Sequence, residues 1–482
     1  MSKVIVSNKG IKKSIFFEGY KYRYDKTYNG TEYYMCDTSR SHGCRARLHK
    51  PVEVDDQRHY ILKGRHLHSG DSRKLHKKEV MTKLKILSKT THMSKRQVII
   101  ASIQGITNAT RSTLPSERTM SRMVTNYRRD PQAPKNPRNF AELVLPPNYR
   151  ITLKGDPFLL YDSFDELDAG ELQLVADRTL IFTTLGNLNF LTECDGLFMD
   201  GTFSVVPVLF GQLYSIHGLK RGWHLPSVFI LMSNKKEETY NEIFEFMLRL
   251  APINPTDFMV DFEMAAMNSV TRYFPLADLH GCHFHFGQSV WRKIQEVGLQ
   301  KQYNEDEEFA LNLRMLVALA FVPVDDVIKA YEELVETAFF NSDDPKIDEL
   351  LDYFQSTYIY RIDRKGKKQS PRFAIPVWNV YENTLAGFPR TNNNVEGWHN
   401  KINSMWGKHP NLFTFIEKLK EEQEITELAI AQCEAGNDPD RRRKKYEMAD
   451  KKLIRLIDKF DKTIHDGSYI PYLKEIAHNA RF

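Results

Sequence analysis

Four side chains near the amino terminus have the types and spacing of a metal site. Seven residues separate Cys36 from Cys44, and 21 further residues precede the sequence His66-Leu67-His68. Two thiolates and two imidazoles suit Zn²⁺, which accepts four such ligands in a closed tetrahedral site. Each residue alone also fits an ordinary strand or loop position, but the complete set favours zinc. The metal would stabilise a small module that has little hydrophobic core of its own.

Three carboxylates farther along the chain suggest a second kind of metal chemistry. Asp200 lies inside an otherwise apolar predicted strand, Asp261 ends a second compact strand, and Glu396 lies near the start of a predicted helix. A buried charge is costly unless it is paired or binds metal, so Asp200 requires a partner. Converging carboxylates suit Mg²⁺ or Mn²⁺, and two such ions about 4 Å apart promote phosphodiester displacement. The same residues also fit a turn, a helix cap and a helix surface.

The elements predicted around these carboxylates determine where they meet. The pattern gives strands at 197–206, 212–219, 225–232 and 258–262, a short run at 277–284, and helices at 238–250, 264–273 and 288–297. In this order the first and fourth strands commonly lie side by side, as in the ribonuclease H fold, so we expect Asp200 near Asp261. Residues 305–355 and the region after Asn392 have helical patterns.

The candidate zinc ligands lie in a different kind of segment. Aromatic and β-branched residues predict short strands at 14–17, 20–24, 32–36, 46–49 and 59–62, with a hairpin turn at Asn29-Gly30. From residue 76 to 129 the pattern changes to three short basic helices, with start signals at Ser94 and Pro115-Ser116-Glu117. Five prolines between residues 130 and 147 then predict an extended linker and the first domain boundary.

The net charge of +6 conceals a strong division along the chain. Residues 1–150 carry 31 Lys and Arg against 12 Asp and Glu, a net charge of +19, whereas residues 151–482 carry 37 against 50, a net charge of −13. The basic third predicts a polyanion-binding module. The residues that flank the zinc ligands and that we expect to contact DNA phosphates are Arg45, Arg47, Lys50, Lys63 and Arg65. The helices at 76–129 fit equally a helix-turn-helix-like DNA contact and a spacer with a solvated basic face.

Length and composition narrow the class of protein. A chain of 482 residues, with 41% hydrophobic and 27% charged residues, is typical of a globular protein of roughly two to four folded units. Its apolar runs fall short of the roughly 18 residues that span a bilayer, so we expect no membrane partner. The five cysteines form no evident disulfide framework, and the first residues lack the apolar core of a secretory signal. A reducing, intracellular compartment is therefore expected.

The amino-terminal segment resembles a known zinc-binding family. The spacing Cys-x7-Cys-x21-His-x-His, the preceding Tyr-Tyr-Met and the following Arg-Ala-Arg are similar to a FLYWCH zinc finger over about residues 7–70. That family is itself similar to WRKY and GCM zinc folds. Tyr34 stands where the family has tryptophan, and it can still pack as the core aromatic residue. The resemblance implies DNA binding by a zinc-stabilised antiparallel sheet.

The larger domain resembles Mutator-like (MULE) transposases of the DDE class. The motifs are Asp-Gly-Thr-Phe at 200–203, Phe-Gly-Gln-Leu-Tyr-Ser-Ile-His-Gly at 210–218, Asp-Phe-Glu-Met-Ala-Ala at 261–266 and Gly-Cys-His-Phe-His-Phe at 281–286. A FLYWCH finger ahead of such a domain is a familiar pairing. The resemblance implies a catalytic triad of Asp200, Asp261 and Glu396 that holds Mg²⁺ or Mn²⁺.

Three further residues are candidate auxiliaries to this triad. Cys282 and His285 match the Cys-x-x-His element of the family. A zinc site there would need two more ligands, so a structural or DNA-positioning role is favoured. His399 lies one helical turn after Glu396 and would face the same way, toward the scissile phosphate or a triad carboxylate. Its alternative is a histidine on the helix surface.

The sequence thus predicts a multidomain DNA transposase. The expected parts are a zinc module at 1–72, a basic helical segment at 73–130, a linker and lead-in at 131–194, a ribonuclease H-like core at 195–300 and 390–410, a helical insertion at 301–389 and a helical end at 411–482. Such a protein would bind double-stranded transposon ends and target DNA in the nucleus as a homodimer or larger assembly. The basic run at 441–445 fits a nuclear localisation signal or a solvated helix face. The alternative function is a transposase-derived, non-catalytic DNA-binding regulator.

Overall fold

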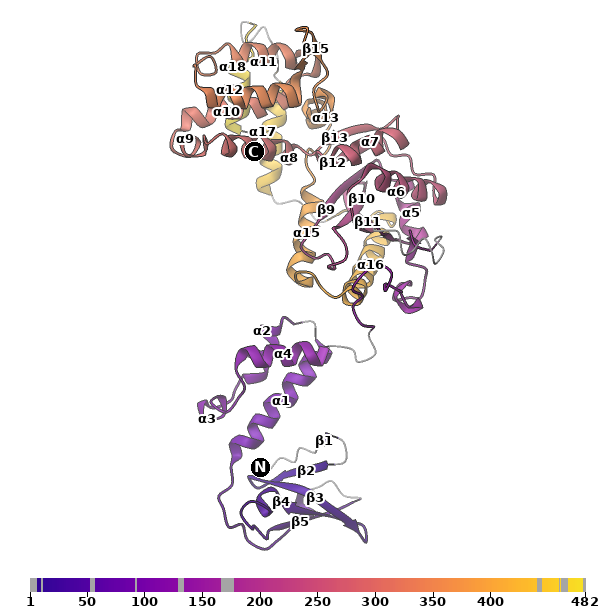
Figure 1. Ribbon diagram of the computed structural model, residues 1–482, viewed down its shortest axis with the longest axis vertical. Helices are drawn as coiled ribbons and strands as arrows, with labels where there is room; N and C mark the ends of the chain where they lie inside the picture. Colours follow the sequence, from indigo (N-terminus) through magenta and orange to yellow (C-terminus); the bar gives the residue numbers. More distant parts are fainter. Residues whose placement is uncertain are drawn as a thin grey trace. The chain divides into compact units, whose positions relative to one another are not determined.

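The computed structural model shows two compact units, Met1–Pro134 and Lys135–Phe482 (Figure 1). The described residues are 7–9, 12–52, 57–91, 93–128, 134–165, 177–439, 444–458, 460 and 467–479. Arg441, Arg442 and Arg443 of the basic run lie outside these described residues.

The first part of unit 1 is a six-stranded antiparallel sheet whose strands pair in sequence order. The strands are β1 (Ser7–Lys9), β2 (Lys12–Phe17), β3 (Tyr20–Tyr28), β4 (Thr31–Cys36), β5 (Arg47–Pro51) and β6 (Ile61–Lys63). Asn29 and Gly30 join β3 to β4 with φ values of 43° and 67°, the left-handed conformation of a two-residue hairpin turn, as predicted. Ile15, Tyr22 and Tyr34 are fully buried in its small core, so Tyr34 takes the expected aromatic position.

The second part of unit 1 is helical. Its helices are α1 (Ser72–Thr90), α2 (Lys95–Ile103), α3 (Asn108–Arg111) and α4 (Glu117–Arg128). Both predicted start signals are present, because Ser94 forms a capping box with Gln97 and Ser116 accepts the backbone N–H of Thr119. The four-residue helix α3 was not predicted. Leu84 and Val98 lie in the buried core that holds the three longer helices together.

Unit 2 is built around a seven-stranded mixed sheet with the order β13-β12-β9-β10-β11-β8-β7. The strands are β7 (Leu159–Asp162), β8 (Thr179–Phe182), β9 (Gly196–Thr202), β10 (Gln212–Lys220), β11 (Trp223–Met232), β12 (Asp257–Val260) and β13 (Asp278–Gly281). The three consecutive strands β9 to β11 are followed by helices that alternate with β12 and β13, as predicted. These helices are α6 (Glu237–Leu250), α7 (Met264–Tyr273) and α8 (His283–Glu296). β12 pairs with β9 in parallel, so the carboxyl ends of these two strands meet at one edge of the sheet.

Residues within the predicted linker and lead-in at 131–194 supply part of this sheet. β7 and β8 extend it beyond β11, and α5 (Leu185–Thr192) packs on β11. A buried ion pair fixes this region: Arg178 Nε donates to Asp162 Oδ1 at 2.8 Å, and Arg178 Nη1 donates to the Leu143 carbonyl at 2.7 Å. The two four-residue strands are too short to give a clear periodic pattern, and neither was predicted.

Replacing Arg178 by Leu is expected to lower the free energy of unfolding of unit 2 by about 3–5 kcal/mol. The substitution leaves the Asp162 carboxylate buried without its cation, and the side chains of the pair are only 6% and 1% exposed. Denaturant unfolding of the two proteins measures the difference. Arg150→Leu is the matched control, because the Arg150–Asp165 pair is 35% and 49% exposed and its loss should change stability by about 1 kcal/mol or less. Equal effects of the two substitutions would contradict the prediction.

Helices dominate the rest of unit 2. The predicted insertion contains α9 (Gln300–Glu305), α10 (Glu307–Ala318), α11 (Val327–Val335), α12 (Pro345–Phe354), a π-helical turn (Gln355–Ile359), the strands β14 (Arg361–Ile362) and β15 (Lys368–Gln369), α13 (Ile375–Trp378) and α14 (Tyr381–Leu385). They are followed by α15 (Asn393–Trp406), α16 (Leu412–Glu434), α17 (Lys444–Ile457) and α18 (Ile470–Asn479). The first helix of the predicted helical end at 411–482 is α16, which ends at Glu434, and Gly436 beyond it has φ 80°.

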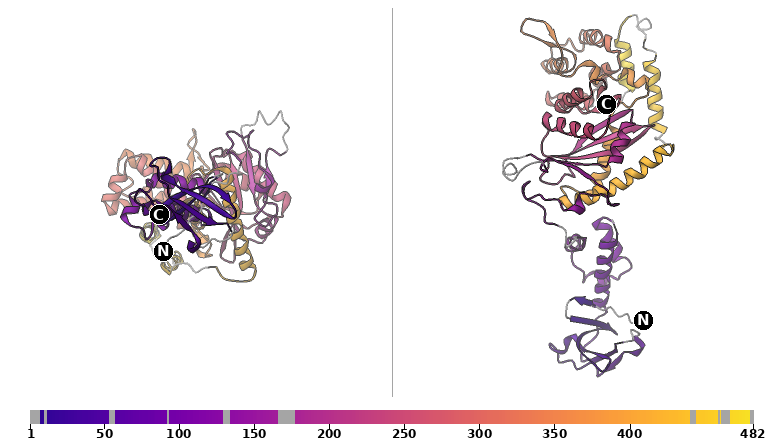
Figure 2. Two further views of the ribbon diagram at one scale, coloured as in Figure 1. Left: turned by 90° about the horizontal axis from the view of Figure 1, so that it is seen from below. Right: turned by 90° about the vertical axis from the view of Figure 1, so that its right-hand side faces the viewer.

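The helices cover both faces of the sheet (Figure 2). Met199 and Ile216 pack in one hydrophobic cluster with residues of α6, whereas Leu213 and Phe229 pack in another with residues of α15 and α16. Because successive residues of a strand point to opposite faces, Asp200 lies on the α15 face of β9. At the other end of the unit, α18 packs against α10 of the insertion. Among the described helices, none is long and apolar enough to cross a membrane.

Candidate functional site

The four predicted zinc ligands come together in unit 1. One atom from each of Cys36, Cys44, His66 and His68 lies within 4.8 Å of the others. Cys36 Sγ is 3.2 Å from His68 Nε2, and Cys44 Sγ is 3.5 Å from His66 Nδ1. Ligands around a tetrahedral Zn²⁺ have sulfur–nitrogen separations of roughly 3.6 Å, so these distances fit the metal.

Neighbouring groups orient both imidazole rings. Tyr22 Oη lies 2.7 Å from His66 Nε2, the nitrogen of this ring that faces away from the cysteines, and the Tyr20 ring stacks on His66. His68 Nδ1 lies 3.0 Å from the carbonyl oxygen of Ser69. A carbonyl oxygen only accepts hydrogen bonds, so this contact places the proton of His68 on Nδ1 and leaves Nε2, the nitrogen beside Cys36, able to bind metal.

The five basic residues predicted to contact DNA differ in their availability. Arg45, Lys63 and Arg65 are exposed, and Arg47 is half-buried beside Lys63 on the neighbouring strand. Lys50 Nζ lies 3.8 Å from a Glu32 carboxylate oxygen, and its side chain is only 12% exposed. Lys50 is therefore the least available of the five for a phosphate. Exposed Lys and Arg side chains on α1 and α2 include Lys74, Lys83, Lys85, Lys89, Lys95 and Arg96.

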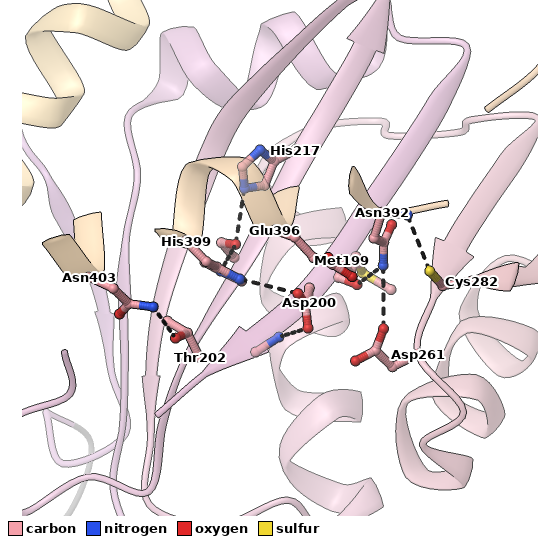
Figure 3. A network of polar contacts seen from close by, with 12 residues as sticks. Met199, Asp200, Thr202, His217, Asp261, Cys282, Asn392, Glu396, His399 and Asn403 are labelled. Carbon is pink, nitrogen blue, oxygen red and sulfur yellow. Dashed lines mark hydrogen bonds and ion pairs between the residues drawn. The ribbon is translucent and has the colours of Figure 1, made fainter. Parts of the chain in front are cut away.

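The three predicted carboxylates lie at one edge of the sheet in unit 2 (Figure 3). Asp200 is buried on β9, Asp261 directly follows β12, and Glu396 lies in the first turn of α15, which packs on β9. The carboxylates of Asp200 and Asp261 are near enough to shift each other's pKa, and both raise the pKa of Glu396. Among the described residues, the three carboxylates do not form a group whose oxygens all lie within 4.8 Å of one another. The arrangement is a close pair with a third carboxylate nearby.

The environments of these carboxylates shift their pKa values in different directions. Burial disfavours charge on Asp200, but the hydrogen bond and charge of His399 outweigh it and lower the pKa of Asp200. Burial raises the pKa of Asp261, and the Asp200 carboxylate adds to the shift despite the contact with His285. Burial also raises the pKa of Glu396, and both aspartates contribute. Such a concentration of negative charge favours a bound cation.

His399 is buried and contacts Asp200, so it does not lie on the helix surface. Its Nδ1 is 3.2 Å from Asp200 Oδ2, and its Nε2 is 3.1 Å from Ser215 Oγ, which in turn is 3.0 Å from His217 Nε2 (Figure 3). Because a carboxylate accepts hydrogen bonds, Nδ1 of His399 carries a proton toward Asp200. Ser215 and His217 were not predicted as site residues, although both lie in the 210–218 motif.

The structure also gathers Cys282, His285 and Glu396. Their ligand atoms lie within 4.8 Å of one another, and no fourth described Cys, His, Asp or Glu joins this group. His285 Nδ1 is 2.8 Å from Asp261 Oδ1, at an angle outside the hydrogen-bond range, so we describe the contact as an ion pair. Although burial opposes charge, the contacts with Asp261 and Cys282 raise the pKa of His285 to about 11. His285 is thus a cation beside the carboxylates, consistent with a structural or positioning role.

Asn392 joins the two sides of the site and was not predicted. Its backbone N–H donates to Cys282 Sγ at 3.3 Å, and its side-chain Nδ2 donates to the Met199 carbonyl at 3.0 Å and to Asp261 Oδ1 at 3.5 Å. It therefore fixes the start of α15 against β9 and α8. The signal available in the sequence was the Asn392-Asn393-Asn394 run immediately before Glu396.

Comparison with known protein families matches two parts of the chain. Residues 5–68 match the FLYWCH zinc finger domain, and residues 196–289 match the MULE transposase domain. The first range contains all four zinc ligands. The second contains Asp200, Asp261, Cys282 and His285 and ends before Glu396. No curated protein matches the chain.

These matches confirm both resemblances inferred from the sequence. The FLYWCH match and the Cys36, Cys44, His66 and His68 cluster together support Zn²⁺ as a cofactor of unit 1. The two domains together indicate DNA as the partner. The chain is a transposase-related DNA-binding protein in which an N-terminal FLYWCH zinc finger precedes a MULE transposase domain.

Proposed function

We propose that this protein is a DDE-type DNA transposase that cleaves DNA at transposon ends and transfers the freed strand to target DNA. The observation that carries the proposal is the meeting of Asp200, Asp261 and Glu396 at the carboxyl ends of β9 and β12. The catalytic domain would be ribonuclease H-like, with its core at 195–300 and 390–410 and the helical insertion at 301–389.

The residues of the site fit a divalent cation. The neighbouring carboxylates of Asp200 and Asp261 repel each other, and the raised pKa of Asp261 reflects desolvation together with this repulsion. Glu396 Oε1 is buried and accepts no hydrogen bond within the described part of the chain. All three side chains offer the hard oxygen ligands that Mg²⁺ or Mn²⁺ prefers. When bound, such ions stabilise negative charge on the attacking and leaving oxygens of a phosphodiester.

The surrounding side chains would prepare these ligands. His399 keeps Asp200 ionised and oriented, and His285 balances the charge of Asp261. Asn392 holds the start of α15, and with it Glu396, against the strand that carries Asp200. The reaction forms no covalent bond to the enzyme, so no nucleophilic side chain is required. Water attacks first, and the freed 3′-hydroxyl of the cleaved strand then attacks target DNA.

Unit 1 would supply the recognition of DNA. The zinc-bearing sheet would bind the terminal repeats, with Arg45, Lys63 and Arg65 exposed to contact phosphates. The basic helices α1 and α2 would add a second DNA contact. Because two transposon ends must be held together, the active form would be a homodimer or larger assembly, acting in the nucleus.

The direct test is incubation of the purified protein with candidate terminal-repeat DNA. We expect strand cleavage in Mg²⁺ or Mn²⁺ and intact DNA when neither metal is added, measured on labelled duplexes with zinc-loaded protein and no chelator. Shuffled duplexes of the same length measure specificity and should be cleaved much more slowly. Specific binding without any cleavage in either metal would overturn the proposal and favour the non-catalytic, transposase-derived regulator.

A further inference from the structure

An exposed aromatic ring and a lysine lie together beside the carboxylates, and neither takes part in the chemistry above. Phe203 directly follows β9, three residues after Asp200, and is 54% exposed. Lys235 Nζ lies 4.8 Å from the centre of the Phe203 ring. About half of the Phe203 residue therefore remains in contact with solvent although the lysine lies over its ring.

The sheet places both residues at the edge where the carboxylates meet. The last residues of β9 and β11, Thr202 and Met232, pair with adjacent residues at the beginning of β10. Phe203 and Lys235 follow these strand ends by one and three residues. They therefore lie at the same edge of the sheet as the carboxyl ends of β9 and β12.

A carboxylate next to the site tethers the lysine. Lys235 Nζ donates to Glu263 Oε2 at 2.7 Å, and Glu263 Oε1 accepts the Tyr240 hydroxyl at 2.6 Å. Glu263 lies two residues after Asp261, and its backbone N–H donates to the Asp261 carbonyl at 2.7 Å. The Lys235 side chain nevertheless remains 44% exposed. An ammonium group has three N–H donors, so Lys235 keeps donors for an external anion.

We propose that Lys235 and Phe203 bind one unpaired nucleotide next to the scissile phosphate. Lys235 contacts its phosphate, and Phe203 stacks on its base. The cation matches the phosphate of a nucleotide, and the exposed ring beside it matches the base. Stacking of a base on an aromatic ring does not depend on the DNA sequence. Neighbouring base pairs cover the faces of each base inside a duplex, so the ring recognises a strand that has opened locally. This inference rests on the proposed function, because the nucleotide would belong to the DNA strand that the carboxylates cleave.

The test uses the full-length protein and a forked DNA duplex of mixed sequence, with 2-aminopurine as the first unpaired base. Fluorescence is titrated without chelator and without added Mg²⁺ or Mn²⁺, so that metal-dependent cleavage does not occur and unit 1 keeps its zinc. The variants are Phe203→Ala, Phe203→Trp and Lys235→Gln. Val208→Ala is the control for the ring, since Val208 is 74% exposed in the same connection between β9 and β10. Lys236→Gln is the control for the lysine, because Lys236 Nζ donates to Asp177 at 2.8 Å instead.

We expect the parent protein and Phe203→Trp to quench 2-aminopurine through stacking. Phe203→Ala should lose the quenching and bind the forked duplex about tenfold more weakly, and Lys235→Gln about fivefold more weakly. Binding of a fully paired duplex should be unchanged, as should binding by both controls. Quenching by Phe203→Ala equal to that of the parent would overturn the assignment. So would a loss of affinity for the forked duplex that is as large in a control variant as in the variant it is matched to.

The failure of this inference can be distinguished from failure of the proposed function. The fluorescence titration requires no catalysis. Expected quenching in a protein that never cleaves DNA would refute the transposase activity and leave the nucleotide contact standing. Normal metal-dependent cleavage together with unchanged binding by Phe203→Ala and Lys235→Gln would refute the contact alone.

Discussion

Replacing Asp200 by Asn is expected to lower metal-dependent DNA cleavage by about 10³-fold or more, because the loss of a metal ligand removes several kcal/mol of charge stabilisation. The amide keeps an oxygen that can accept the backbone N–H of Gly201, which lies 2.6 Å from Asp200 Oδ1. The amide nitrogen then takes the place of Oδ2 and loses the hydrogen bond from His399 Nδ1, but the repulsion between Asp200 and Asp261 is removed as well, so the variant should still fold. Single-turnover cleavage of labelled terminal-repeat DNA measures the rate, and thermal unfolding shows whether the variant is folded.

Asp257→Asn is the matched control for this prediction. Asp257 lies on β12 at the end opposite Asp261 and is 2.9 Å from His280 Nε2. Its replacement should change the cleavage rate by no more than a few-fold. A cleavage rate of Asp200→Asn equal to that of the parent would remove Asp200 from the catalytic site, whatever activity the protein has.

Replacing Cys36 by Ser is expected to release the zinc ion and unfold the six-stranded sheet of unit 1. Its core is small, with Ile15, Tyr22 and Leu48 among its few buried side chains. The apparent free energy of structural zinc binding is about 10–16 kcal/mol, whereas an entire domain is stable by about 5–15 kcal/mol. The free energy lost with the metal therefore exceeds the stability that this small sheet would have without it. DNA affinity should fall at least about tenfold, since the exposed basic side chains lose their fixed positions.

Metal analysis, limited proteolysis and DNA binding of the full chain measure these effects. The Cys36→Ser protein should lack zinc and be cleaved within residues 12–68, while unit 2 stays resistant. Cys433→Ser is the control, because Cys433 is a buried thiol of α16, 3.9 Å from the Lys220 carbonyl. It should retain zinc and DNA affinity. Unchanged metal content and proteolysis of Cys36→Ser would contradict the assigned ligands.

Local patterns in the sequence were sufficient for much of the fold. The spacing of Cys36, Cys44, His66 and His68 identified a cluster that the structure brings together, because all four lie in one small module. The Asn29-Gly30 turn and the Ser94 cap depend on a few adjacent residues, and both were predicted. The order of strands and helices from β9 to α8 also followed from periodicity. These features depend on short stretches of chain, so neighbouring residues determine them.

The arrangement of the site depended on contacts between distant residues. Asn392 donates to the Met199 carbonyl across 193 residues, and His399 reaches Asp200 across 199. The ion pair of Lys50 with Glu32 likewise shows which of the predicted DNA contacts is the least available. By itself, the sequence determined the chemical types of the candidate ligands and the strand ends that carry them. Tertiary structure alone decided which side chains surround them, because the packing of α15 against β9 and the contact of Asn392 with Cys282 at the start of α8 leave no periodic signal in any one segment.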